Sequence, residues 1–195
     1  MKNKMFIALS GVAIAAAAWI MAQPRPLPPS IDRRGVPSWQ VDNEMPRDVF
    51  TFCRLRYSSY SGRGRKWATD YPDADLNFSY RLQELTSMKV HPDGMVLNIT
   101  DPKLTDYPFV YMAEPGDLWL SEPEVKALRG YLLNGGFLMV DDFWGGDEYD
   151  NFATEMRRVF PDREPKELPL EHPIFHCVFD LKEKPQLPSI GQAMQ

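Results

Sequence analysis

The sequence predicts an α/β domain with a mostly parallel sheet and helices on both faces. Short, wholly apolar runs at residues 109–112 and 137–140 are typical of strands inside a parallel sheet, which are buried on both faces. Segments with apolar residues at helical spacing lie before, between and after these runs. Alternation of such strands with amphipathic helices favours a sheet that is covered on both sides.

Five strands are expected along the chain. The first has strand composition, and Arg54 and Arg56 fall on one of its faces because they are two positions apart. The others are short apolar runs bounded by turn residues. The strands are predicted at residues 49–57, 95–99, 109–112, 137–140 and 174–179.

Three helices are predicted between these strands: one over residues 75–87, one between Ser121 and Asn134, and one over residues 148–160. Ser121 and Glu124 form a capping-box pattern at the start of the second helix, and Gly135 ends it because glycine accepts a left-handed conformation. Asp75 and Asp147 are the expected N-caps of the other two helices. The stripes expected to face the core are Phe78, Leu82 and Leu85, then Val125, Leu128 and Leu132, then Phe152, Met156 and Val159.

The N-terminal segment has the layout of a secretory signal peptide. Lys2 and Lys4 precede an uncharged, mostly apolar stretch at residues 6–22, with cleavage expected after Ala22. We therefore expect a periplasmic or secreted protein. The alternative is an uncleaved inner-membrane anchor formed by residues 6–22, which would then be the only contact with the membrane.

A proline-rich stretch at residues 23–47 is predicted to be a linker, and residues 48–195 the folded domain. The 195-residue chain has a net charge of −5, which argues against general nucleic-acid binding. No cofactor is predicted. Export would allow the two cysteines, Cys53 and Cys177, to form one disulfide, and the alternative is two buried thiols.

Candidate site residues follow the predicted strands, because ligands of open α/β sheets bind outside the carboxyl ends of the strands. The loop after the first strand adds aromatic and acidic side chains to this edge. The candidates for ligand binding are Arg54, Arg56, Tyr57, Trp67, Asp70, Glu114, Asp141, Asp142 and Trp144, and those for acid–base catalysis are Asp101, Glu114, Asp141 and Asp142.

Each group of candidates has a structural alternative. Arg54 and Arg56 would bind an anion such as a carboxylate or phosphate, or would form an ion pair with Asp101, Glu114 or Asp141. Asp141 and Asp142, with Asp147, Glu148 and Asp150 nearby, would hold Mg²⁺ or Ca²⁺ if the chain bends between the first two. The aromatic residues suit a sugar ring, a protein interface or simple packing.

Several motifs in order resemble a bacterial family of unknown function, the one numbered 4159. They are Phe52-Cys53-Arg54-Leu55-Arg56-Tyr57, Trp67-Ala68-Thr69-Asp70-Tyr71-Pro72, Asp75-Leu76-Asn77, Tyr107-Pro108-Phe109-Val110-Tyr111-Met112 and Gly135-Gly136-Phe137-Leu138-Met139-Val140-Asp141-Asp142. The resemblance covers about residues 48–190. It implies a flavodoxin-like fold of the class I glutamine amidotransferase-like type.

The same resemblance bears on catalysis. Amidotransferases of this type place a cysteine nucleophile at the turn that falls here near Asp141, Asp142 and Phe143, and this sequence has no cysteine there. Similar domains continue into at least one more strand and helix, whereas this sequence stops at Gln195, so we expect either a shortened member or an incomplete chain. A missing strand would leave an open sheet edge. The expected function is a non-catalytic module that binds a small ligand or an envelope protein. The alternatives are a carboxylate-dependent hydrolase acting on a glycan and a structural module of an envelope complex.

Overall fold

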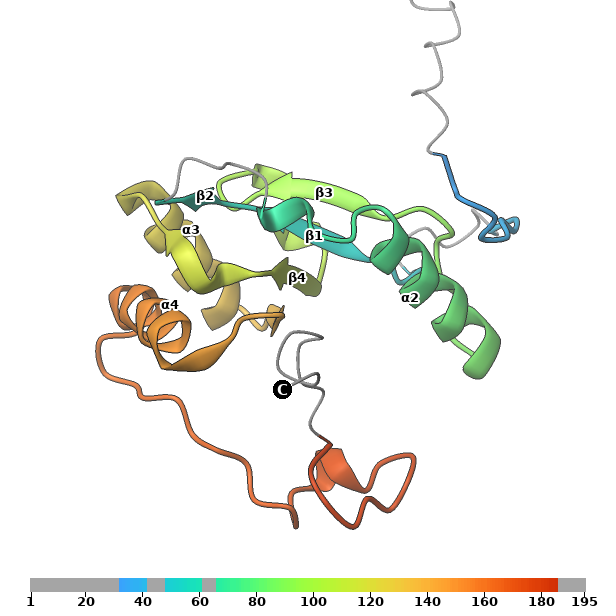
Figure 1. Cartoon of the computed structure of the whole chain (residues 1–195). Coiled ribbons are helices and arrows are strands. Elements are labelled where there is room, and N and C mark those ends of the chain that lie inside the picture. The colour runs from blue at the N-terminus through green and yellow to red at the C-terminus, as the bar shows by residue number, and fades with distance from the viewer. Residues whose placement is uncertain (1–31, 42–47, 61–65, 186–195) are drawn as a thin grey trace, which may run out of the picture. The chain divides into compact units, whose positions relative to one another are not determined.

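The computed structural model of the protein describes residues 32–41, 48–60 and 66–185 (Figure 1). From Arg33 onward these residues belong to one compact unit, Arg33–Gln195. The predicted signal peptide and residues 23–31 and 42–47 of the predicted linker lie outside the described residues. Among the residues that are described, no helix is both long enough and apolar enough to cross a membrane.

A four-stranded parallel sheet organises the domain, with the strand order β3-β1-β4-β6. Arg54 of β1 lies opposite Val96 of β3 and Tyr111 of β4. The prediction of a mostly parallel α/β sheet is therefore confirmed. The strands are β1 (Cys53–Arg56), β3 (Met95–Asn98), β4 (Phe109–Ala113) and β6 (Phe137–Asp141).

Two strand predictions need correction. The first predicted strand is shorter than expected, because only Cys53–Arg56 pairs continuously and Phe50 makes an isolated bridge to Val90. The strand predicted at residues 174–179 is wrong: a short 3₁₀ helix, η5 (Pro173–Phe175), and turns occupy this stretch. No described strand pairs with this stretch.

The sequence analysis missed a small second sheet. In it β2 (Ser58–Ser59) pairs antiparallel with β5 (Leu118–Trp119). Strands of two residues are too short to show a period-2 pattern, so composition carries no signal for them.

Helices α3 (Glu122–Leu133) and α4 (Gly145–Val159) cover one face of the main sheet. Their buried residues include Val125, Leu128 and Val159, which the predicted stripes contained. The capping box at Ser121 is confirmed, since the Glu124 carboxylate accepts the Ser121 backbone N–H at 2.8 Å. Gly135 has a φ of 93°, as the predicted helix stop requires.

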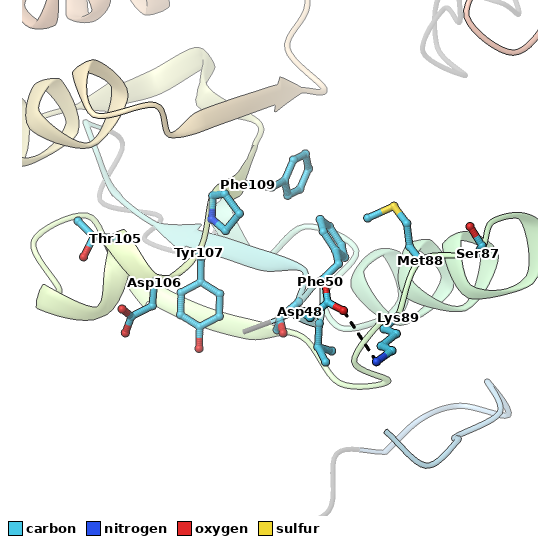
Figure 2. Close-up of a pocket in the computed structure, with 12 residues that line it drawn as sticks. Asp48, Phe50, Ser87, Met88, Lys89, Thr105, Asp106, Tyr107 and Phe109 are labelled. Atoms are coloured by element: carbon cyan, nitrogen blue, oxygen red, sulfur yellow. Dashed lines mark ion pairs between the residues drawn. The ribbon is translucent and has the colours of Figure 1, made fainter. Parts of the chain in front are cut away.

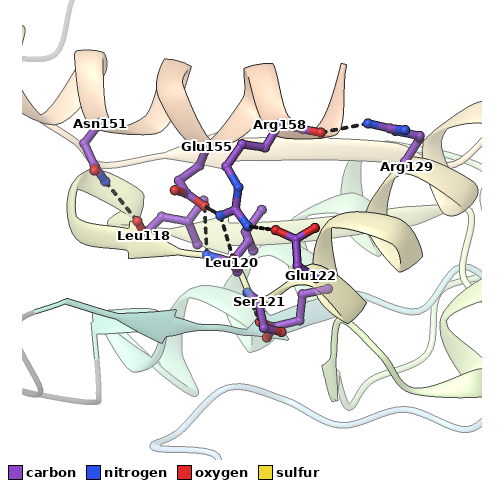
Figure 3. A network of polar contacts seen from close by, with 9 residues as sticks. Leu118, Leu120, Ser121, Glu122, Arg129, Asn151, Glu155 and Arg158 are labelled. Atoms are coloured by element: carbon purple, nitrogen blue, oxygen red, sulfur yellow. Dashed lines mark hydrogen bonds and ion pairs between the residues drawn. The ribbon is translucent and has the colours of Figure 1, made fainter. Parts of the chain in front are cut away.

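A buried carboxylate holds α4 on the segment that leads into α3. Glu155 is 3% exposed and accepts the backbone N–H of Leu120 at 2.8 Å and an Arg158 Nη1 proton at 2.7 Å (Figure 3). Arg158 also donates to the Leu120 carbonyl at 2.6 Å and to Glu122 at 2.7 Å. This network fixes the helix whose first turn lies at the carboxyl end of β6.

Helix α2 (Asp73–Leu85) covers part of the opposite face. Phe78 packs against Phe52 and Phe109, with ring centroids 5.1 and 6.0 Å apart. The predicted stripe is partly wrong: Leu85 is 77% exposed, and the buried residues of α2 are Asp75, Leu76 and Ser79. Asp75 is not the N-cap, because Pro72 occupies that position and the Asp75 carboxylate turns inward.

Residues 33–41, which we name the strap, pack on the same unit although they fall in the predicted linker. The Trp39 Nε1–H donates to the Val90 carbonyl at 2.7 Å, and the Trp39 ring lies 6.1 Å from that of Tyr80. Arg33 pairs with Asp93 and donates to the Pro92 carbonyl. The strap therefore contacts α2 and the turn before β3.

Candidate functional site

The carboxyl ends of β4 and β6 bring together three of the predicted site residues. The Glu114 backbone N–H donates to the Asp141 carbonyl at 2.9 Å, which extends the β4–β6 ladder to the strand ends. Glu114 has a φ of 44° and Asp142 a φ of 61°. Residues other than glycine rarely adopt this left-handed region, and such strain is concentrated at functional sites.

Trp144, the residue directly before α4, completes this group. Its indole N–H donates to Asp142 Oδ1 at 2.8 Å, and its backbone N–H donates to Glu148 Oε2 at 2.7 Å. Trp144 is the N-cap position of α4, so the prediction that Asp147 caps this helix is wrong. The Glu148 side chain packs directly over Gly116, where any Cβ would collide with it.

Burial and neighbouring carboxylates raise the pKa of Glu114. Desolvation is the largest cause, and the charges of Asp142 and Glu148 act in the same direction. A hydrogen bond from the Thr69 side chain and the charge of Lys66 oppose the rise. The site thus contains carboxylates in unequal surroundings, since Asp141 at the neighbouring strand end is exposed.

Arg54 lies beneath this group and forms a buried ion pair. Its side chain is fully buried, and Nη2 lies 2.5 Å from Asp75 Oδ1. Nη1 donates to the carbonyls of Trp67 and Thr69 at 2.9 and 3.0 Å. Arg54 therefore forms an ion pair, as the structural alternative predicted. The predicted partners, Asp101, Glu114 and Asp141, were wrong, because the partner is Asp75. Because its side chain has no exposed surface, Arg54 holds neighbouring residues of the site in place and does not itself face solvent.

The Arg54 guanidinium also links the loop of residues 66–71 to the sheet. Its Cζ lies 4.9 Å from the centre of the Tyr111 ring, and the Tyr111 hydroxyl lies 3.4 Å from Asp141 Oδ2. Arg54 also donates a hydrogen bond to the Thr69 carbonyl, and the Thr69 side chain bonds Glu114. The guanidinium that pairs with Asp75 therefore also fixes Thr69 beside Glu114. Arg54 is thus a positioning residue for Glu114 and Asp141.

Tyr57 ties β1 to the end of β4. Its hydroxyl lies 2.7 Å from the Ala113 carbonyl and 2.5 Å from the Glu114 carbonyl. Arg56 is exposed, with its Cζ 4.7 Å above the Trp67 ring, so this pair forms one side of the loop. Asp70 has a φ of 56°, and its carbonyl accepts the N–H of Ala74.

Asp101 does not join this group. It is the N-cap of η3 (Pro102–Asp106), where its carboxylate accepts the Lys103 backbone N–H at 2.9 Å. No contact among the described residues joins Asp101 to Glu114, Asp141 or Asp142. Asp101 therefore has a local structural role, and the acid–base candidates that lie together are the other three.

The described residues contain no group of three or more His, Cys, Asp or Glu side chains placed to hold a metal ion. Both cysteines are free. Cys53 is buried, as one alternative predicted, and burial raises the pKa of its thiol to about 12. Cys177 is exposed, so the expectation that both thiols are buried is wrong for this residue.

A cavity of about 920 Å³ lies at the opposite, amino-terminal edge of the sheet (Figure 2). Its only ion pair among the lining residues is Lys89 with Asp48, 3.8 Å apart. Phe50, Tyr107 and Phe109 add apolar surface to its wall. The strained carboxylates lie at the other edge, where ligands of parallel sheets bind. We therefore place the candidate site at the carboxyl ends of β4 and β6 and not at this cavity.

Sequence reasoning missed the part that Asp75, Thr69 and Tyr111 play in the site, and it considered Glu148 only as a carboxylate near a possible cation. An aspartate near the start of a helix is usually interpreted as an N-cap. Nothing else in the sequence indicated that the Asp75 carboxylate points inward to Arg54. Tyr111 lies within an apolar run, so the sequence predicted a core residue there. An acidic residue in the first turn of α4, such as Glu148, is expected from the helix dipole alone.

The fold and the site define a parallel α/β domain with a group of strained carboxylates at the carboxyl ends of two neighbouring strands. The sequence model of a domain of unknown function, DUF4159, matches residues 51–195. The chain therefore belongs to the DUF4159 family. No curated protein matches the chain.

Proposed function

We propose that this protein is an exported, non-catalytic binding domain whose ligand site lies at the carboxyl ends of β4 and β6. The observation that carries the proposal is that two residues with left-handed backbones, Glu114 and Asp142, lie at neighbouring strand ends. The backbone hydrogen bond from Glu114 to Asp141 holds these strand ends together. The chain maintains backbone strain at these two positions. A purely structural turn would be served better by glycine.

The chemistry of these side chains suits a ligand with several hydrogen-bond donors. Carboxylate oxygens accept hydrogen bonds from hydroxyl or amine groups, and Trp144, which is 37% exposed, offers an aromatic face beside them. A sugar ring has both a face to stack and hydroxyl groups to donate. We therefore take a sugar or a hydroxylated amine as the ligand class.

The finer fold assignment is also part of this proposal. Numbered in chain order, the strands of the main sheet run 2-1-3-4, which matches the first four positions of the flavodoxin-like order. This supports the glutamine amidotransferase-like class. In that class the turn after β6 would carry the nucleophile, and here Asp142 and Phe143 occupy it. Cys53 is no substitute, because its raised pKa keeps the thiol protonated at neutral pH.

The test is a thermal melt of the exported protein in the presence of separate ligand classes. The panel contains neutral sugars, amino sugars, inorganic phosphate, and Mg²⁺ or Ca²⁺ against EDTA. A ligand at ~100 times its dissociation constant should stabilise the native state by about 2.7 kcal/mol. We expect a shift with a sugar or amino sugar that Asp142→Asn abolishes.

Asp150→Asn is the matched control, since Asp150 is an exposed aspartate on α4 away from the strand ends. It should retain the ligand-induced shift. A melt that no member of the panel moves, or a shift that Asp142→Asn leaves intact, would contradict binding at this site. A shift with phosphate alone would assign the protein an anion ligand and contradict the proposed class.

One observation favours a second candidate, a carboxylate-dependent hydrolase. The pKa of Glu114 is raised and Asp141 is exposed, and two carboxyl groups in unequal surroundings are the requirement for an acid and a base. Release of a reducing sugar from an envelope glycan, lost in Glu114→Gln, would establish this activity. Binding without product over the same period would favour the non-catalytic proposal.

Export is tested separately. Alkaline phosphatase fused after residue 47 becomes active only outside the cytoplasm. Activity that requires residues 1–22 would support the signal peptide, and the size of the mature chain would distinguish cleavage from anchoring.

A further inference from the structure

The order of the strands marks one position in the sheet where the chain changes direction. From β1 the chain goes to β3 on one side, and it then crosses to β4 on the other side of β1. In open α/β sheets, ligands bind at the carboxyl ends of the strands that flank such a switch point. These strands are β1, which ends at Arg56, and β4, whose last residue precedes Glu114. Arg56 and Glu114 therefore flank the position that this rule selects.

Arg56 offers a positive charge on the β1 side of the switch point. Its guanidinium Cζ lies 4.7 Å from the centre of the Trp67 ring, and such stacking on an aromatic face orients a guanidinium. Trp67 belongs to the short helix η2 (Lys66–Ala68), which contacts both β1 and β4. Among the described residues the exposed Arg56 side chain forms no ion pair and no hydrogen bond. Its N–H groups are therefore available to an anion, and the exposed Asn98 lies beside it in the β1–β3 register.

The loop of residues 66–71 contacts both sides of the switch point. Its Trp67 ring lies against Arg56, and its Thr69 side chain bonds Glu114. Neighbouring strands of a sheet are about 4.8 Å apart, so groups at the ends of β1 and β4 can contact one small molecule. One loop thus holds a cation on the β1 side and a carboxylate on the β4 side.

The charges on the β4 side decide which anion fits. Glu114, Asp142 and Glu148 lie there, and Lys66, 3.7 Å from Glu148, offsets only part of their charge. A phosphate group carries about two negative charges at neutral pH, so these carboxylates would repel it more strongly than a singly charged carboxylate. A carboxylate also matches the planar fork of a guanidinium. The hydroxyl groups of a sugar can donate to Glu114 and Asp142, so a sugar that carries a carboxylate meets both requirements.

We propose that the ligand of this site is a sugar acid, whose carboxylate binds Arg56 and whose hydroxyl groups donate to Glu114 and Asp142. This inference rests on the proposed function, because it names the ligand class of the same site. Trp67 orients the guanidinium, and Trp144 offers a face on which the sugar ring stacks. Arg56 is the specificity-determining residue, since a neutral sugar leaves its charge without a partner.

Calorimetric titration of the full chain with hexuronic acids tests this specificity. The probes are glucuronate, galacturonate and their two uncharged amides, which keep the shape and the hydroxyl groups of the acids. We expect a hexuronate to bind at least about tenfold more tightly than its amide, because charge-assisted hydrogen bonds are roughly twice as strong as neutral ones. Arg56→Gln should remove this preference and leave the affinity for the amide unchanged.

Arg163→Gln is the matched control. The Arg163 guanidinium is also exposed and also lies 4.7 Å from the centre of an aromatic ring, that of Phe160, but it is not at a strand end. This variant should keep the full preference for the acid. Circular dichroism confirms that each variant is folded. Arg56→Lys carries the same test if Arg56→Gln does not fold, since lysine keeps the charge but lacks the planar fork, and it should lose part of the preference.

The possible failures have different meanings. Equal affinity for a hexuronate and its amide, with both lost in Asp142→Asn, would overturn the sugar-acid inference and leave the proposed function in place. A preference for the acid that persists in Arg56→Gln would also overturn it, because the carboxylate would then bind elsewhere. If no hexuronate or amide binds but a neutral or amino sugar stabilises the protein, this inference alone is wrong. If nothing in either experiment binds, the proposed function fails with it.

Discussion

Arg54 and Asp75 form an ion pair that is almost completely removed from solvent, with side chains 0% and 2% exposed. Arg54 comes from the central strand β1 and Asp75 from the first turn of α2. The pair therefore joins the sheet to the helix that covers it. The remaining Arg54 protons bind the loop that reaches Glu114, so one buried contact supports both the fold and the candidate site.

Replacing Asp75 with alanine should strongly destabilise the protein, because a buried guanidinium would lose its counter-charge. The expected loss is about 3–5 kcal/mol in the free energy of unfolding, measured by urea denaturation. Asp73→Ala is the control on the same helix, since the Arg34–Asp73 pair is exposed and such pairs contribute at most about 1 kcal/mol. Equal losses in the two variants would show that burial of the pair does not matter.

Glu114→Gln should stabilise the protein at neutral pH and change its pH dependence. The pKa of Glu114 is raised in the folded state, so the native protein binds this proton more tightly than the unfolded chain does. Stability is then lost as the pH rises from the normal glutamate range through the raised pKa. The gain in melting temperature of the variant should disappear below about pH 4, where the carboxyl is protonated in both states.

Thermal melts between pH 3 and 8 check this expectation, and the difference between wild type and variant isolates Glu114 from the other carboxyls. A variant that is less stable than wild type at pH 7 would mean that the charged form is favoured in the folded state. The Thr69 hydrogen bond would then outweigh burial.

The two cysteines should differ sharply in reactivity. Cys177 is exposed, whereas the pKa of Cys53 is raised to about 12 by burial first and by the charges of Asp75 and Asp101 next. An aromatic disulfide reagent at pH 8 should titrate one thiol in the native protein and two in urea. Rapid reaction of both native thiols would contradict the burial of Cys53.

Two glycines near the end of α3 should respond in opposite ways to alanine. A Cβ on Gly136 would collide with the Tyr131 ring, which is buried, so Gly136→Ala should cost about 1–3 kcal/mol. Gly130 lies within α3 with open space around it, so Gly130→Ala should stabilise the helix by up to about 1 kcal/mol. Urea denaturation compares the two, and similar changes would contradict the close contact with Tyr131.

The sequence predicted those parts of the fold that rest on local patterns. Ser121, Glu124 and Gly135 define α3 through capping chemistry, and these signals need no knowledge of the remaining chain. The apolar run of β6 was also recognised, but its position at the sheet edge was not. Edge and centre depend on which strands are neighbours, and composition does not contain that information.

The candidate site shows the same division. The rule that ligands bind at the carboxyl ends of parallel strands selected Glu114, Asp141 and Asp142, which do lie together. The partner of Arg54 was not predictable, because Asp75 lies 21 residues away in a position that an N-cap would also occupy. Long-range pairs of this kind depend on how a helix lies across the sheet, and they have no local signature.

The strap has a mechanical consequence. Its anchor points are Trp39 on the Val90 carbonyl, Arg33 on Asp93 and Arg34 on Asp73. A pull on the N-terminal end therefore loads α2 and the turn before β3, and these contacts must be broken one after another before tension reaches β1. When the chain before the strap is under tension, the contacts of the strap would bear the force first and so protect the central strand β1.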